Sequence, residues 1–78
     1  MKKSEVLFEI WCKLAIESGV VEETPKGLCW TEKAEDGDLL NSLEYNAVAQ
    51  YRQKFMFYGD IEEQDFEEFR EMLYEKIS

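Results

Sequence analysis

Histidine is absent from this sequence of 78 residues, and proline, glycine, cysteine and basic residues are all scarce. Without histidine, a serine or cysteine nucleophile lacks its usual base, and a zinc site would need carboxylates for most of its ligands. The two cysteines, Cys12 and Cys29, do not form a metal or redox pair. We therefore expect no enzymatic activity, no metal ion and no cofactor. We expect two buried, reduced thiols, with a Cys12–Cys29 disulfide as the alternative.

Long apolar runs are also missing, which bears on membranes and secretion. No run approaches the roughly 20 apolar residues that a membrane-spanning helix needs. The basic start Met1-Lys2-Lys3 is followed by acidic and basic residues at every fourth position, so it does not have the apolar centre of a secretion signal. We therefore expect a cytoplasmic protein that has no membrane partner.

Acidic residues outnumber basic ones by 18 to 9, which gives a net charge of −9. The surplus falls in two blocks: residues 22–44 hold seven acids and two bases, and residues 60–78 hold eight acids and two bases. Residues 45–59 hold only Arg52 and Lys54. A chain this acidic is repelled by DNA, RNA and anionic lipid at long range. We expect no direct binding of nucleic acid, and a protein partner with a basic surface is favoured.

The most apolar stretch, residues 6–16, predicts the helix around which the rest of the chain must be organised. Its few charged residues recur every four positions, so on a helix they form one narrow polar stripe and leave most of the circumference apolar. We predict a helix over 4–18, with Ser4 as its N-cap and Gly19 in the left-handed conformation after its last turn. Such a helix has to be covered on several sides.

Two further helices are predicted from apolar residues three and four positions apart. One spans 39–57 with Asp38 as its N-cap, and the other spans 61–77 with Asp60 as its N-cap. The fold class is therefore α-rich: one compact three-helix domain over residues 1–78. The side chains expected to cover the first helix are Val21, Leu28, Trp30, Leu40, Leu43, Ala47, Tyr51, Phe66, Phe69 and Leu73.

Residues 20–31 predict a short β-hairpin, or an ordered loop, between the first and second helices. Two β-branched residues precede a Thr24-Pro25-Lys26-Gly27 turn, and Leu28 to Thr31 alternate in size and polarity. The run SGVVEETPKGLCWTEKA resembles the wing of winged-helix DNA-binding domains, which implies a transcription regulator. Because such a domain places about three helices before its wing and only one fits here, this is the lesser alternative.

The third predicted helix carries a row of carboxylates, and we take it as a candidate partner-binding face. Its members are Glu62, Glu63, Glu67, Glu68, Glu71 and Glu75. Carboxylates four residues apart on a helix lie about 6 Å apart along its axis, close to the phosphate spacing of a nucleic-acid strand. Such a face can occupy a basic channel meant for DNA or RNA. The alternative is a solvated face that only keeps the protein soluble.

A second candidate contact surface combines aromatic and basic residues at the end of the second helix. It consists of Arg52, Phe55, Phe57 and Tyr58, and aromatic residues and arginine are favoured at protein interfaces.

The sequence as a whole therefore predicts a small acidic protein-binding module that inhibits a nucleic-acid enzyme or acts as an adaptor. Anti-restriction, anti-CRISPR and host-takeover proteins of phages and mobile elements are of this type. The alternative is a self-associating structural protein, for instance a homodimer.

Overall fold

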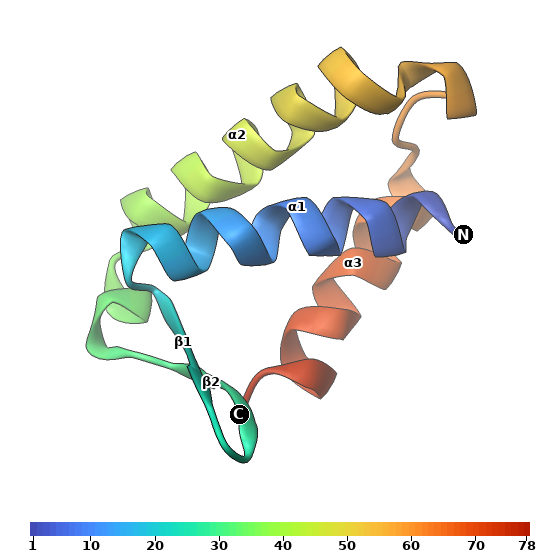
Figure 1. Ribbon diagram of the computed structural model, residues 1–78. Helices are drawn as coiled ribbons and strands as arrows, with labels where there is room; N and C mark the ends of the chain where they lie inside the picture. Colours follow the sequence, from blue (N-terminus) through green and yellow to red (C-terminus); the bar gives the residue numbers. More distant parts are fainter.

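The computed structural model describes residues 1–78 and shows an α-rich domain with a β-hairpin between its first and second helices, as predicted. In chain order the elements are α1 (Lys3–Ser18), β1 (Val21–Thr24), β2 (Gly27–Trp30), the 3-10 helix η1 (Glu32–Glu35), α2 (Gly37–Phe55), the 3-10 helix η2 (Met56–Tyr58) and α3 (Glu63–Lys76). Helix α1 lies between α2 and α3, and the hairpin and the C-terminus lie together at the end opposite η2 (Figure 1). None of these helices is long and apolar enough to cross a membrane.

Helix α1 forms the centre of the core, as its sequence predicts. Leu7, Trp11 and Ala15 are at most 1% exposed. The Trp11 ring meets Phe69 of α3 and Trp30 of β2 edge to face, with ring centroids 6.2 and 5.8 Å apart. The other buried side chains that enclose α1 include Val20, Val21, Leu43, Ala47, Val48, Tyr51, Ile61 and Ile77.

The start of α1 differs from the prediction, whereas its end agrees. Lys2, not Ser4, is the N-cap, and the Lys2 N–H donates to Glu5 Oε1 over 3.1 Å. Ser4 is fully buried, and its hydroxyl donates to Glu68 of α3 over 3.4 Å, so packing takes this side chain away from capping. Gly19 has φ +82° and its N–H donates to a carbonyl in the last turn, as predicted.

The predicted N-caps of the other two helices are also wrong by two residues. Asp36, not Asp38, caps α2, and its carboxylate accepts hydrogen bonds from the two nearest free N–H groups over 3.1 and 3.2 Å. Glu62, not Asp60, caps α3, and its N–H donates to Asp65 Oδ2 over 3.0 Å. Each segment holds several acids that could serve as caps, and local sequence does not choose between them.

The C-terminus makes a contact that the sequence did not predict. Ile77 was expected inside the third helix, but α3 ends at Lys76, and Ile77 is extended, buried and bridged in parallel to Leu28 of β2. The Ser78 N–H donates to the Leu28 carbonyl, and the Trp30 N–H donates to the Ser78 carbonyl, both over 2.9 Å. A two-stranded hairpin is marginal in water, so this third segment stabilises the predicted hairpin and ties α3 to it.

Candidate protein-binding site

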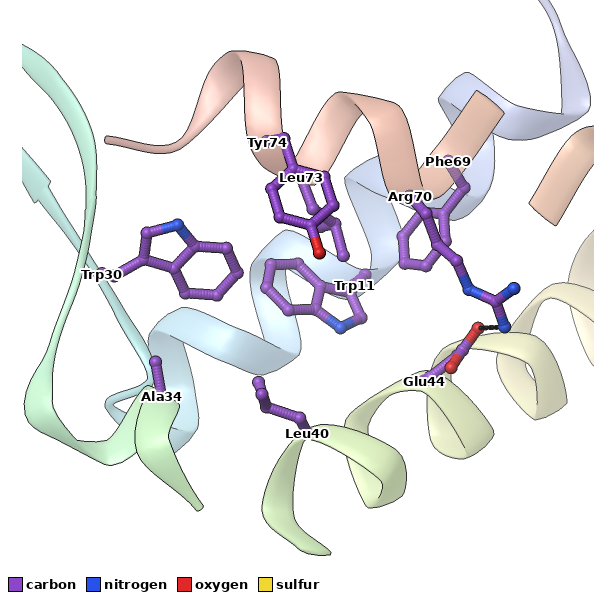
Figure 2. A pocket seen from close by; sticks show the side chains of 9 residues that line it. All are labelled: Trp11, Trp30, Ala34, Leu40, Glu44, Phe69, Arg70, Leu73 and Tyr74. Atoms are coloured by element: carbon purple, nitrogen blue, oxygen red, sulfur yellow. Dashed lines mark hydrogen bonds and ion pairs between the residues drawn. The ribbon is translucent and has the colours of Figure 1, made fainter. Parts of the chain in front are cut away.

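The hollow with the most apolar lining lies where α2, α3 and the hairpin fail to meet over Trp11. Both helices pack on α1 rather than on each other. The hollow has a volume of about 290 Å³. Its lining residues are Trp11, Trp30, Ala34, Leu40, Glu44, Phe69, Arg70, Leu73 and Tyr74 (Figure 2). Figure 2 shows Trp11 at the centre, with side chains from β2, η1, α2 and α3 around it.

A second, shallower hollow of about 330 Å³ continues along the same side of the molecule. It is lined by Asn41, Glu44, Tyr45, Val48, Arg52, Phe66 and Arg70. Glu44 and Arg70 line both hollows, and Arg70 Nη2 lies 3.0 Å from Glu44 Oε1. The Arg70 guanidinium also lies over the Phe66 ring, 5.6 Å from its centroid. We call the two hollows together the α2–α3 groove; an ion pair crosses it between them.

The floor of the groove offers a hydrogen-bond donor that the fold leaves free. The Trp11 indole N–H donates no hydrogen bond within the chain. Every fully buried side-chain nitrogen or oxygen does have a partner, so this nitrogen is not fully buried. The small accessible part of Trp11, 1% of its surface, must therefore include this N–H. Figure 2 shows the nitrogen turned toward the α2 side of the hollow, where Leu40 and Glu44 lie.

Four of the six predicted acidic residues form a free row on the outside of α3. Glu63, Glu67, Glu71 and Glu75 follow one another at every fourth position and are exposed. The four ion pairs of the chain all use other carboxylates. We call these four residues the acidic stripe.

The other two predicted acids stabilise the fold through contacts within the chain. Glu62 is the N-cap of α3. Glu68 is half-buried against α1, where it accepts the hydrogen bond from Ser4 and lies 3.8 Å from Lys2 Nζ. The remaining two ion pairs involve cations near the groove and near α3: Arg52 with Asp60, and Lys3 with Asp65.

The predicted aromatic residues gather at the far end of α2, which we call the aromatic corner (Phe55 to Tyr58). Phe55 packs on the buried Tyr51, with ring centroids 6.1 Å apart, and Tyr58 stacks on Phe55. Phe57 is 77% exposed and lies against Tyr58, with ring centroids 4.3 Å apart. The structure therefore brings these rings together at the surface.

The fourth predicted member of this surface, Arg52, is bound to a carboxylate. Its Nε and Nη2 donate to the two oxygens of Asp60 over 3.0 and 3.4 Å. These bonds, together with the N–H of Ile61, lower the pKa of Asp60 below its ordinary value of 3.8. Arg52 thus ties α2 to the segment before α3 and offers a partner little free charge.

Both cysteines are free, as expected, but they are half-buried and not fully buried. Burial raises the pKa of the Cys12 thiol to about 11, although Lys76 acts in the opposite direction. Cys12 is therefore protonated at neutral pH. No group of three or more cysteine and carboxylate side chains is arranged to hold a metal ion.

The groove is the part of the site that sequence reasoning missed. Trp30, Leu40 and Leu73 pack against the core around α1, as predicted, but they are only half-buried and also form walls of the hollow. The signal that could have indicated an open face is a pair of tyrosines, Tyr45 and Tyr74, that were not needed to cover α1. In the structure they are 75% and 85% exposed on the facing sides of α2 and α3.

No protein-family model matches this sequence, and comparisons with curated proteins and with solved structures find no match. Function is therefore inferred from the residues and geometry of this chain alone.

Proposed function

We propose that this chain is a non-enzymatic, cytoplasmic protein-binding module that inhibits a protein with a basic, nucleic-acid-binding surface or serves it as an adaptor. The observation that carries this proposal is the acidic stripe, four exposed carboxylates outside every ion pair of the chain. They are spaced about 6 Å along one helix face. In a basic channel they would replace phosphates and release the same counterions. Inhibitors of restriction or CRISPR enzymes act on surfaces of this kind.

The stripe is presented on a helix that is held in place at several points. Phe69 anchors α3 in the core, Glu62 caps its start, and Ser78 ties its end to β2. Lys3 adds an ion pair to Asp65 in the first turn, with its nitrogen 3.4 Å from the carboxylate. A preorganised surface loses less conformational entropy on binding, which favours a function in recognition for this face.

The test is affinity capture from a native lysate, at low and at high salt, with two variants of equal charge. The stripe variant carries Glu63→Gln, Glu67→Gln, Glu71→Gln and Glu75→Gln. The control variant carries Glu9→Gln, Glu17→Gln, Glu22→Gln and Glu23→Gln, all exposed and carried by α1 or β1, not by α3. The stripe variant loses three like-charge contacts between residues four apart, so its stability should not fall.

We expect the wild type and the control variant to retain a basic nucleic-acid-binding protein at low salt. High salt or added DNA should release that protein, and the stripe variant should not retain it. Equal retention by both variants, or retention that is insensitive to salt and DNA, would contradict the proposal.

Self-association through the aromatic corner is a second candidate, favoured by one observation. Met56, Phe57 and Tyr58 are consecutive and are 48%, 77% and 60% exposed. Contiguous exposed apolar surface of this kind marks many interfaces. Sedimentation equilibrium tests it: a dimer that Phe57→Ala disrupts supports this candidate, and a monomer at high concentration excludes it.

A further inference from the structure

We infer that the α2–α3 groove binds a short segment of the basic partner, with one bulky apolar side chain in the hollow over Trp11 and lysine or arginine on either side of it. This inference rests on the proposed function, since it names the part of the partner that the site recognises. Its grounds are the size of the hollow, a free donor in its floor and the charges around its rim.

The size and lining of the hollow suit one bulky apolar side chain. Its volume is about 290 Å³, and its lining is predominantly apolar. Ala34 and Leu40 leave room above Trp11 that larger side chains would fill. A leucine or phenylalanine of a partner protein is an occupant of suitable size and polarity.

The free indole N–H of Trp11 adds a specific requirement. A segment that covers the hollow excludes water from this donor, and an unpaired buried donor would weaken binding. The occupant must therefore bring an acceptor as well as an apolar group. A polypeptide satisfies both requirements, because each residue carries a carbonyl oxygen beside its side chain.

The charges around the groove select basic flanks. On α3, Glu67 and Glu71 lie within one turn of Arg70 and Tyr74, which line the hollow. The two cations of the groove, Arg70 and Arg52, are each bound to a carboxylate of this chain. The free charge beside the groove is therefore negative, so basic flanks are attracted and acidic flanks are repelled.

The rims of the groove carry exposed aromatic side chains on both sides. Tyr45 on α2 is 75% exposed and Tyr74 on α3 is 85% exposed. Tyrosine is enriched in protein interfaces, because its ring supplies apolar area and its hydroxyl supplies a hydrogen bond. A segment lying along the groove would contact both rings.

Intrinsic fluorescence tests the inference directly, because the two tryptophans of the chain both line the hollow. The probe is a short capped peptide with a central leucine flanked by lysines. We expect a saturable change in tryptophan emission, with an affinity that falls as salt rises. Replacing the leucine by serine should weaken binding roughly tenfold or more. Replacing the lysines by glutamates should abolish it.

Two exposed aromatic residues provide a matched pair of protein variants. Tyr74→Ala removes a ring from the rim and should weaken peptide binding several-fold. Phe57→Ala removes a ring of similar exposure from the aromatic corner and should leave binding unchanged. Both positions are at the surface, so both variants should keep the wild-type circular dichroism spectrum.

The inference is overturned if the leucine peptide gives no saturable change, or if the serine peptide binds equally well. It is also overturned if Phe57→Ala weakens binding more than Tyr74→Ala, or if the emission change follows self-association without peptide. These failures are distinct from failure of the proposed function. If Tyr74→Ala still captures the basic partner and the stripe variant does not, the acidic stripe acts without the groove.

Discussion

Two regions around α1 contain the same kinds of side chain but differ in how completely those side chains are buried. In the core, Leu7 and Ala15 are completely enclosed by neighbouring elements. In the α2–α3 groove, Leu73 and Trp30 are only half-buried, because α2 and α3 pack on α1 and diverge from each other. The difference shows that packing on α1 buries the core without closing the space between α2 and α3. We propose recognition of a partner as the role of this space.

The largest expected effect comes from making the same substitution in both regions. Leu7→Ala should lower the free energy of unfolding by about 2–5 kcal/mol, because it leaves a cavity in an enclosed site. Leu73→Ala should cost less, about 1 kcal/mol, because this side chain is only partly buried in the folded protein. Urea unfolding followed by circular dichroism measures both values. Equal losses would show that the groove is as closed as the core.

The second-largest effect should be a loss of stability of the folded protein at alkaline pH, which arises from groups in the enclosed region. Burial raises the pKa of Cys12 from 9.0 to about 11 and raises the pKa of Tyr51 above 10.0. The folded state therefore keeps protons that the unfolded state releases. This contribution is complete below about pH 9 and is lost as pH rises through 9 to 11. Urea midpoints across that range should fall, and Cys12→Ala should make the fall shallower. An unchanged slope in this variant would contradict the assignment.

The ion pair across the groove should contribute less to stability than either of these. Arg70 and Glu44 have side chains that are 58% and 27% exposed. Exposed pairs typically contribute under about 1 kcal/mol. A double-mutant cycle with Arg70→Gln and Glu44→Gln should give a coupling energy in that range. A larger coupling would mean that the ion pair holds α2 and α3 together and that the groove is part of the core.

The smallest effect concerns Asp60, the carboxylate that binds Arg52 of the groove. Its pKa is lowered from 3.8, chiefly by the hydrogen bond from Arg52. Its contribution to stability is therefore present above about pH 3.8 and is lost as pH falls through the folded-state pKa. Carboxyl NMR titration should find this depressed pKa in the wild type and a higher pKa in Arg52→Gln. Identical titration curves would remove the proposed link between α2 and the segment before α3.

The sequence predicted the helices, the hairpin and most of the core, because these follow from local periodicity. The apolar stretch containing Leu7 and Trp11 could only be a covered helix, and Thr24 to Gly27 is a turn by composition. Two helix starts were wrong by two residues because tertiary contacts use the predicted caps: Ser4 is used by packing, and Asp60 is used by Arg52. For α2, the sequence offers both Asp36 and Asp38 as caps and does not choose between them.

The site was predicted only where it lies on a single element. Glu67 and Glu71 share one helix face by spacing alone, so the acidic stripe could be predicted. The groove depends on how far α2 and α3 diverge, and the strand contact of Ile77 joins residues far apart in the chain. Helical periodicity also does not show that Glu68 turns toward α1, since that depends on Ser4 and Lys2.

The central claim is that the open region, not the aromatic corner, is the binding face. The most direct measurement is the NMR spectrum of the indole N–H groups during titration with the lysine-flanked leucine peptide. Trp11 and Trp30 give the only two indole signals, and both line the hollow. We predict that both signals shift and that the backbone signals of Phe57 and Tyr58 stay in place. Unmoved indole signals with shifts confined to the aromatic corner would contradict the account.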